Sequence, residues 1–278
     1  MRFDLNGIHL NVEDQGLGPA LVLLHGFTGS SQTWAQFDKS WPDLRLIAVD
    51  LPGHGESDSP RDMIHYSLHS TLAELREILE KLQLERVTLL GYSLGARIAL
   101  HFALKYPERV SRLVLESASP GIKNPAEGTQ RRRDDEALAG KLERDGIEAF
   151  VDYWQALPLW KSQAALPTAR REALRCQRLQ NSTTGLANSL RGVGAGSCPP
   201  VYDRLGELAM PLLVIAGELD RRYSELALLI AARAPAATLQ IIGNAGHAVH
   251  LERPEEFAAA VGEFLAATNQ APAQERSR

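Results

Sequence analysis

The residue most suited to do chemistry in this sequence is Ser93, at the centre of Gly91-Tyr92-Ser93-Leu94-Gly95. A short apolar run, 87–90, precedes this segment, and apolar residues at helical spacing follow over 94–105. A sharp turn from strand to helix strains the backbone of the middle serine and exposes its hydroxyl, and glycines on either side avoid steric clashes there. The segment therefore predicts a reactive serine. The alternative is an ordinary serine near a helix start.

A serine hydroxyl is inert at neutral pH unless a base takes its proton, and the sequence offers a suitable base. His247 follows the apolar run 239–242, and Asp220 follows the run 212–216 across a short turn. An imidazole can accept the serine proton, and a carboxylate fixes its tautomer and offsets its charge. Residues that follow parallel strands meet at one sheet edge. The order Ser, Asp, His is also that expected of a serine at such a turn.

Two other residues compete for these roles. His250 lies three residues after His247 and is the rival base, but His247 is preferred because it follows a glycine and lies closer to the preceding strand. Glu218 is the alternative acid, in which case Asp220 would be a turn residue.

Two backbone N–H groups are expected to stabilise negative charge on the reacting molecule. His25-Gly26-Phe27 follows the apolar run 20–24. In this arrangement an oxyanion hole pairs an N–H from that loop with the N–H after the serine, which indicates Phe27 and Leu94. The Gly/Pro-rich segment 50–57 is interpreted as a shaping turn.

Short apolar runs alternate with helical patterns in the segments around these residues. Strands are expected at 20–24, 46–49, 87–90, 113–115, 212–216 and 239–242, and helices at 67–82, 94–105, 224–233 and 254–267. This alternation predicts an α/β fold with a mostly parallel sheet flanked by helices.

The alternation breaks between about 120 and 205, where helical patterns rich in Arg, Trp and Gln are interpreted as an inserted helical cap. The expected organisation is one discontinuous core, 1–120 and 205–267, with the cap at 121–204. The polar tail 268–278 is expected to be frayed. The cap holds 13 Lys and Arg against 10 Asp and Glu, or +3, which leaves −7 for the remainder of a chain of net charge −4. A positive cap over an acidic core points to an anionic ligand between them.

Composition limits the function classes. A chain of 278 residues with 44% hydrophobic content suits one sizeable core. The net charge of −4 gives no footprint for nucleic acid, and no stretch approaches the roughly 18 apolar residues that span a bilayer. Small-molecule chemistry is therefore expected.

Other sequence features concern redox state, location and cofactors. Cys176 and Cys198 lack the spacing of a zinc or redox motif and are interpreted as reduced thiols, with a disulfide as the alternative. The first residues show no secretory signal, so a cytoplasmic location is expected. No metal cluster, phosphate-binding glycine loop or dinucleotide fingerprint is apparent, so no cofactor or metal is expected.

The segments around these residues resemble those of α/β-hydrolases, and the resemblance covers roughly residues 20–266. More narrowly, the chain resembles the 2-succinyl-6-hydroxy-2,4-cyclohexadiene-1-carboxylate (SHCHC) synthases of menaquinone biosynthesis. The segments that carry this resemblance are 24–30, 91–97, 116–121, Trp154, 157–160, Asn181 and 185–192.

The resemblance implies a lyase rather than a hydrolase. In that family the histidine-activated serine acts as a base that removes a ring-system proton, and pyruvate leaves by 2,5-elimination. The substrate carries three carboxylates, and the product forms through a delocalised oxyanion. The resemblance thus implies a small polycarboxylate as the ligand, which arginines read well because the guanidinium fork matches a carboxylate.

Five residues match the family's substrate-binding positions: Arg97, Arg131, Arg178, Tyr92 and Trp154. Each has a blander alternative. Arg97 could be a structural ion pair, Arg131 could belong to a solvated helix face with its neighbours 132 and 133, and the aromatics could serve packing alone.

Two departures from the family pattern stand out. Ala96 replaces a glycine, and Arg221-Arg222-Tyr223 stands where a lysine and a phenylalanine are more frequent, which could alter how the loop of Asp220 meets the substrate. The alternatives to the lyase are a serine esterase or carbon–carbon bond hydrolase of the same fold and, more distantly, a silent binding protein. The three arginines discriminate among them, since an esterase for uncharged acyl groups has little use for three cations.

Overall fold

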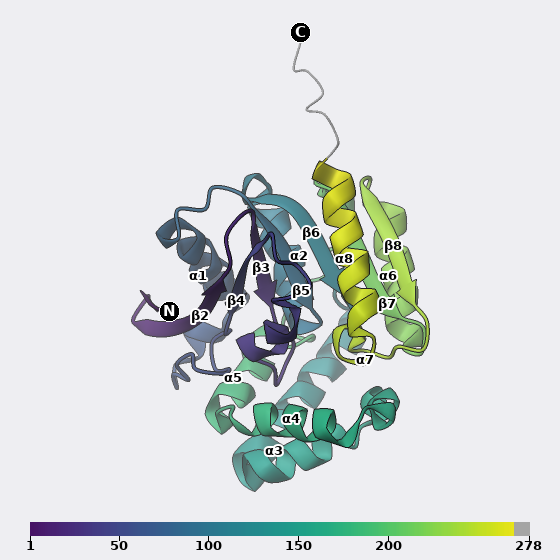
Figure 1. Cartoon of the computed structure of the whole chain (residues 1–278). Coiled ribbons are helices and arrows are strands. Elements are labelled where there is room, and N and C mark those ends of the chain that lie inside the picture. Colours follow the sequence, from purple (N-terminus) through teal and green to yellow (C-terminus); the bar gives the residue numbers. More distant parts are fainter. Residues whose placement is uncertain (270–278) are drawn as a thin grey trace.

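An eight-stranded sheet organises residues 1–269, the part of the chain that this computed structural model describes (Figure 1). The strands are β1 (Arg2–Leu5), β2 (Ile8–Gln15), β3 (Ala20–Leu24), β4 (Arg45–Val49), β5 (Val87–Tyr92), β6 (Val110–Glu116), β7 (Leu212–Gly217) and β8 (Ala237–Ile242). Their order across the sheet is β1-β2-β4-β3-β5-β6-β7-β8.

Helices connect these strands. The α-helices are α1 (Leu68–Lys81), α2 (Leu94–Lys105), α3 (Pro125–Gln155), α4 (Thr168–Leu179), α5 (Thr183–Val193), α6 (Arg221–Arg233), α7 (Val249–Glu252) and α8 (Pro254–Asn269). Short 3₁₀ helices are η1 (Ser31–Phe37), η2 (Met63–Tyr66), η3 (Pro107–Arg109), η4 (Pro158–Ala165) and η5 (Tyr202–Glu207).

The predicted α/β architecture is confirmed. Strands β3 to β8 pair in parallel, while β1 and β2 form an antiparallel hairpin whose second strand pairs with β4. All six predicted strands are present. The largest difference is β6, which starts at Val110 rather than at residue 113, because the half-buried Ser111 and Arg112 hide its first part in an apolar-run search.

Alternation along the central strands divides the core between two faces of the sheet. Val22 and Leu24 point into a cluster formed with α1, α2 and α6, whereas Leu21 and Leu23 point into a second cluster formed with η1 and α8. Since successive strand residues face opposite sides, a strand covered on both faces is apolar at every position. This is why the parallel strands could be recognised as continuous apolar runs.

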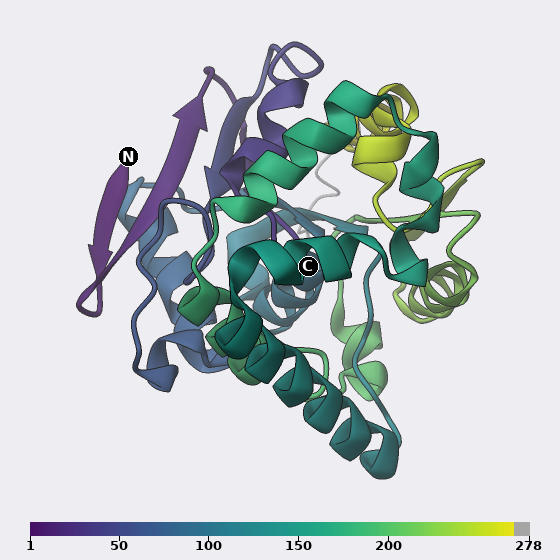
Figure 2. The same ribbon diagram turned by 90° about the horizontal axis from the view of Figure 1, so that it is seen from below.

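Helices α3, α4 and α5 lie between β6 and β7 in the chain and gather below one end of the sheet (Figure 1). Seen from below, they lie across that end (Figure 2), and we call residues 121–204 the cap. The cap has a small hydrophobic cluster of its own, which includes Leu142, Phe150 and Leu186. Gly146, at φ 80°, divides α3 into two helical parts.

The C-terminal boundary needs a correction. Helix α8 continues to Asn269, two residues beyond the predicted helix end at 267. Thr268 supports this last turn by donating its hydroxyl to the carbonyl of Phe264 at 2.8 Å. The rest of the predicted tail, 270–278, lies outside the described residues.

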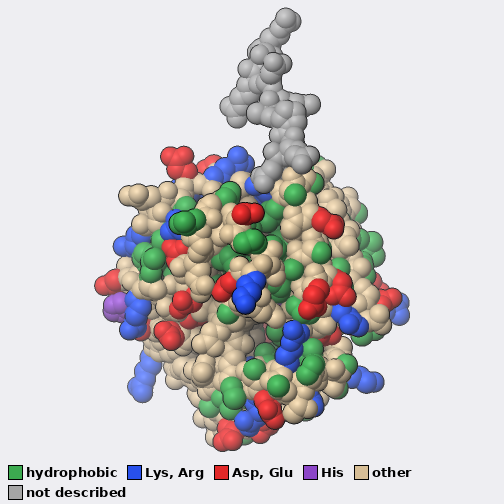
Figure 3. All heavy atoms as spheres, viewed as in Figure 1, with side chains coloured by type: hydrophobic (Ala, Val, Ile, Leu, Met, Phe, Trp, Pro, Cys, Tyr) green, Lys and Arg blue, Asp and Glu red, His purple; other side chains and the backbone are tan. Residues whose placement is uncertain are grey.

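Cys176 is exposed and Cys198 is buried, and both are free thiols, so the alternative of a disulfide between them is wrong. Within residues 1–269, no helix is long and apolar enough to cross a bilayer. The face in Figure 3 shows acidic and basic side chains interspersed rather than a field of one sign.

Candidate active site

Ser93 occupies a strained turn between β5 and α2. Its φ of 51° is positive, a region that residues other than glycine rarely adopt. A Cβ on Gly91 would collide with the carbonyl of Gly95, and a Cβ on Gly95 would collide with the carbonyl of Leu24. The two glycines are therefore needed for the turn that presents the serine hydroxyl.

The structure brings Ser93, His247 and Asp220 together from three separate parts of the chain. Ser93 Oγ lies 2.9 Å from His247 Nε2, and His247 Nδ1 lies 2.7 Å from Asp220 Oδ2. Asp220 Oδ1 also accepts the backbone N–H of Tyr223 at 3.3 Å. This geometry suits a tautomer in which Nδ1–H donates to Asp220, which leaves Nε2 free to accept the serine proton.

The two competing residues lie elsewhere. His250 is fully buried and its Nδ1 lies 2.9 Å from both carboxylate oxygens of Glu116 rather than near Ser93. Glu218 is exposed and accepts the backbone N–H of Asn244 at 3.0 Å. The contacts therefore favour His247 over His250 and Asp220 over Glu218.

His25 fixes the loop that carries Phe27 through hydrogen bonds of both its ring nitrogens. His25 Nδ1 lies 2.8 Å from the carbonyl of Gly26, and its Nε2 accepts the N–H of Leu51 at 3.1 Å. Burial lowers the pKa of His25, which keeps the ring neutral and able to act as donor and acceptor at once. Phe27 and Leu94 both line the cavity beside Ser93, as their expected role in an oxyanion hole requires.

This cavity is small and lies between the core and the cap. It encloses about 110 Å³, and Leu159 of η4 is one of its lining residues. Leu159 also lines an open cleft of about 740 Å³, which reaches Asp220 and His247. Ligand sites typically measure about 300–1,000 Å³. The enclosed part of the site is therefore smaller than a typical ligand site, and it adjoins a larger open cleft.

Arg97 lies on α2, one turn after Ser93, and lines the same cavity. It is 7% exposed, and its Nη1 donates to the carbonyl of Val193 at 2.8 Å. Its Nε has no hydrogen-bond partner among residues 1–269, and no carboxylate of that segment lies within 4.0 Å. The alternative of a structural ion pair is thus not seen here.

Of the three consecutive arginines on α3, Arg131 is the one that lines the cavity. Its Nε donates to the buried carboxylate of Asp135 at 2.8 Å, which leaves the end of the guanidinium for a ligand. Arg132 donates to the carbonyl of Gly196, and Arg133 is exposed. Only these last two belong to a solvated face.

Arg178 is 3% exposed and lines a second small cavity, which shares Phe27, Tyr92 and Trp160 with the Ser93 cavity. Its guanidinium lies 5.3 Å from the centre of the Trp160 ring, and burial lowers its pKa to about 10. Within residues 1–269 it has neither an ion pair nor a hydrogen bond through the guanidinium. A buried cation without an anion is costly, so the site is suited to an anionic ligand.

Aromatic side chains form the remaining walls. Tyr92 and Trp154, both expected from the sequence, line the Ser93 cavity. So do two residues that were not assigned to the site from sequence. Trp160 has its ring edge-on to His247 at 5.6 Å, and Tyr223 lies edge-on at 4.4 Å. Tyr223 belongs to the segment that departs from the family pattern, and its place next to Asp220 was the available signal.

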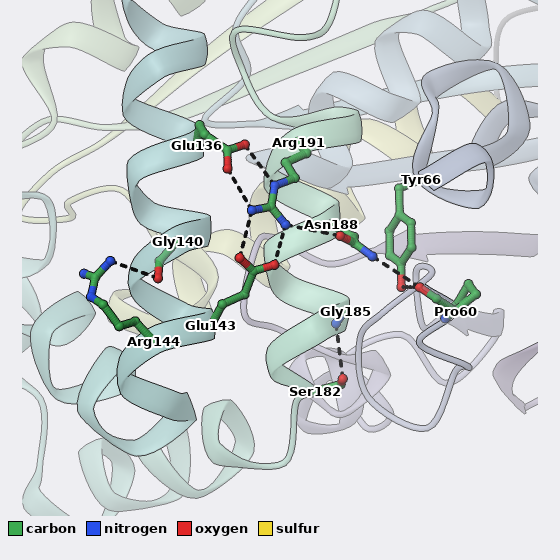
Figure 4. Close-up of polar contacts among 10 residues, drawn as sticks. All are labelled: Pro60, Tyr66, Glu136, Gly140, Glu143, Arg144, Ser182, Gly185, Asn188 and Arg191. Atoms are coloured by element: carbon green, nitrogen blue, oxygen red, sulfur yellow. Dashed lines mark hydrogen bonds and ion pairs between the residues drawn. The ribbon is translucent and has the colours of Figure 1, made fainter. Parts of the chain in front are cut away.

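A group of ion pairs fixes the position of α3 against α5. Figure 4 shows Arg191 of α5 between Glu136 and Glu143 of α3, with four N–H···O contacts of 2.5–2.9 Å. Asn188 donates to the carbonyl of Pro60 at 3.3 Å and so connects α5 to the core. We call Arg191, Glu136 and Glu143 the clasp. It holds the helix that carries Arg131.

Much of the positive charge of the cap is therefore neutralised away from the cavity, as in the clasp and in the pair of Arg175 with Asp152. Arg97 and Arg131 on the walls of the Ser93 cavity, and Arg178 in the adjoining cavity, therefore favour an anionic ligand more directly than the net charge of +3 does. Within the described 269 residues, no three His, Cys, Asp or Glu side chains converge as metal ligands would.

The fold and site define a serine–histidine–aspartate protein of the α/β-hydrolase class, and a family model for the alpha/beta hydrolase fold matches residues 19–254. A Bacillus subtilis (strain 168) protein, provisionally named an SHCHC synthase, is 44% identical over 262 residues, which cover 94% of this chain and 96% of the relative. The SHCHC synthase of Serratia proteamaculans (strain 568) is 31% identical over 89% of this chain and 93% of its own length.

Solved structures agree with these relatives. The structure of MenH from S. aureus superposes with a TM-score of 0.90 at 36% identity, and it covers 93% of this chain and 99% of that one. The chain belongs to the SHCHC synthase family, which confirms the resemblance inferred from its motifs.

Proposed function

We propose that this chain is an SHCHC synthase, a carbon–oxygen lyase of menaquinone biosynthesis. It would eliminate pyruvate from 2-succinyl-5-enolpyruvyl-6-hydroxy-3-cyclohexene-1-carboxylate to give SHCHC. The names of its relatives support the reaction, and the site supports the substrate class, a small polycarboxylate.

The observation that carries the proposal is the buried, unpaired guanidinium of Arg178, 3% exposed and without an anionic partner in residues 1–269. Arg97 and Arg131 add two further cations on the walls of the Ser93 cavity. Three carboxylates of the substrate would match three arginines. A site for an uncharged acyl group would leave the guanidinium of Arg178 and the Nε of Arg97 without partners at considerable cost.

In the proposed first step, Ser93 acts as the general base. His247 Nε2, 2.9 Å from Ser93 Oγ, takes the hydroxyl proton as the oxygen removes the proton at the ring carbon that bears the succinyl group. The electron pair moves onto the succinyl ketone and forms a delocalised oxyanion. Asp220, 2.7 Å from His247 Nδ1, stabilises the imidazolium that develops.

In the second step, the electron pair returns through the ring and the carbon–oxygen bond to the enolpyruvyl group breaks. The departing enolpyruvate takes up one proton, which His247 can return, and becomes pyruvate. The backbone N–H groups of Phe27 and Leu94 are the proposed donors to the oxyanion, since both residues line this cavity.

The test is to offer the purified protein the enolpyruvyl intermediate and to measure pyruvate release. Rapid release is expected for the wild type, and loss is expected for Ser93→Ala. Arg131→Ala should raise KM, whereas Arg133→Ala, its exposed neighbour on the same helix, should leave KM unchanged.

A serine esterase or carbon–carbon bond hydrolase is the alternative, because the same three residues can also activate a nucleophilic serine. Rapid hydrolysis of a simple aryl ester without pyruvate release would favour that alternative. The cytoplasmic location expected from the sequence stays a prediction.

A further inference from the structure

Glu116, the last residue of β6, is completely buried although it carries a carboxylate, and it lies near both Ser93 and His247. It pairs in register with Tyr92 on β5, the residue before Ser93. None of the steps proposed above uses it.

The backbone of Glu116 holds the serine. Its carbonyl accepts the N–H of Ser93 at 2.9 Å, just where the chain turns from β5 into α2. The strained φ of Ser93 therefore has a fixed support on the neighbouring strand.

The side chain of Glu116 holds the segment that carries the histidine. Its Oε1 accepts the backbone N–H of His250 at 3.0 Å, and both carboxylate oxygens lie 2.9 Å from His250 Nδ1. The next residue, Ser117, donates its hydroxyl to the carbonyl of His247 at 2.8 Å. Ser117 itself has a positive φ of 49°.

We propose that Glu116 is a positioning residue that sets the distance between Ser93 and His247. One end of β6 is bonded to the serine turn and, through Glu116 and Ser117, to both ends of the segment 247–250. The inference rests on the proposed role of the Ser93–His247 pair. A displacement of about 1 Å in such a pair can reduce the rate on the order of 100-fold.

The type of residue at 116 argues for this role. A buried ionic or polar pair rarely stabilises a core better than apolar residues of similar volume. The other wholly buried glutamate, Glu74 on α1, has no hydrogen-bond partner for either oxygen within residues 1–269. The carboxylate of Glu116 instead makes three contacts of 2.9–3.0 Å, all with His250 in the segment that also carries His247. Glu74 thus provides a matched control.

The test compares Glu116→Ala with Glu74→Ala. Ser93 is labelled with a fluorophosphonate probe, whose rate reports activation of the serine by His247 whatever the natural substrate is. For Glu116→Ala we expect a labelling rate at least about tenfold below that of the wild type, and a kcat that falls with KM nearly unchanged. Glu116→Gln should recover part of the rate, because its amide oxygen still accepts the N–H of His250.

Glu74→Ala should label at the wild-type rate. A folded Glu116→Ala variant that labels within about twofold of the wild type would overturn the proposal, as would an equal loss in Glu74→Ala. If Glu116→Ala fails to fold, Glu116→Gln and Ser117→Ala decide the question, with slower labelling expected in both and wild-type labelling in both overturning it. A wild type that labels but releases no pyruvate would refute the proposed function and leave this inference standing.

Discussion

His247 Nδ1 lies 2.7 Å from Asp220 Oδ2, and both side chains are almost completely buried. The carboxylate therefore selects the tautomer of the imidazole that faces Ser93. In Asp220→Asn, an amide N–H would face Nδ1 and favour the wrong tautomer. We expect kcat for pyruvate release to fall by roughly 10⁴-fold, as for an equivalent change in another Ser-His-Asp enzyme.

The control for this variant is Glu225→Gln, an exposed change on α6, the helix that begins directly after Asp220. This control should keep the wild-type kcat. If Asp220→Asn retains kcat within about tenfold of the wild type, Asp220 is not the orienting acid.

Arg97→Ala tests whether this arginine binds a substrate carboxylate. Because Arg97 is buried and has no acidic partner among the described residues, its loss should leave a carboxylate unpaired in the complex. We expect kcat/KM to fall by about 100-fold, or on the order of 3 kcal/mol, and Arg97→Lys to recover part of it. A wild-type kcat/KM in Arg97→Ala would contradict the assignment. A thermal scan shows whether the lost bond to Val193 also lowers stability.

Glu74 should make stability depend on pH. Both of its carboxylate oxygens lack a hydrogen-bond partner within residues 1–269, and burial raises its pKa from 4.5 to about 8. Between these two pH values the folded state keeps a proton that the unfolded state has lost, so stability falls as pH rises through this window and then levels off.

Glu74→Gln removes this dependence, because the amide does not titrate. The variant should gain stability relative to the wild type as pH rises from about 4.5 to about 8. Urea unfolding at pH 5, 7 and 9 measures this difference. Glu80→Gln, an exposed change on the same helix, should show no such trend, and an unchanged difference across the series would exclude the mechanism.

The clasp should stabilise the cap more than the whole fold. Arg191 makes paired contacts with two carboxylates, but Glu136 and Glu143 are about half-exposed, so the gain is modest and depends on salt. Arg191→Met should speed amide hydrogen exchange in α5 and in the first part of α3, while Tm falls by only a few degrees. Lys141→Met, which breaks an ion pair within α3 alone, should not affect α5. Equal exchange in Arg191→Met and the wild type would show that the clasp does not hold the cap.

The sequence by itself determined the sheet, the serine turn and the family. These features depend on local rules: apolar runs mark strands buried on both faces, and the turn at Ser93 requires glycines at 91 and 95 whatever surrounds it. Ser93, Asp220 and His247 each follow a predicted strand, and this placement predicted that they meet, because the carboxyl ends of parallel strands lie at one edge of the sheet.

Only the tertiary structure decided between residues that are alike in sequence. His247 and His250 are only three positions apart, but Ser93 contacts His247 and Glu116 holds His250. Likewise, of the three consecutive arginines 131–133, Arg131 is the one that lines the cavity. The burial of Arg178 and the contacts of Glu116 both depend on residues that are far apart in the chain. Contacts of this kind are set by packing across the whole fold, which no local sequence pattern records.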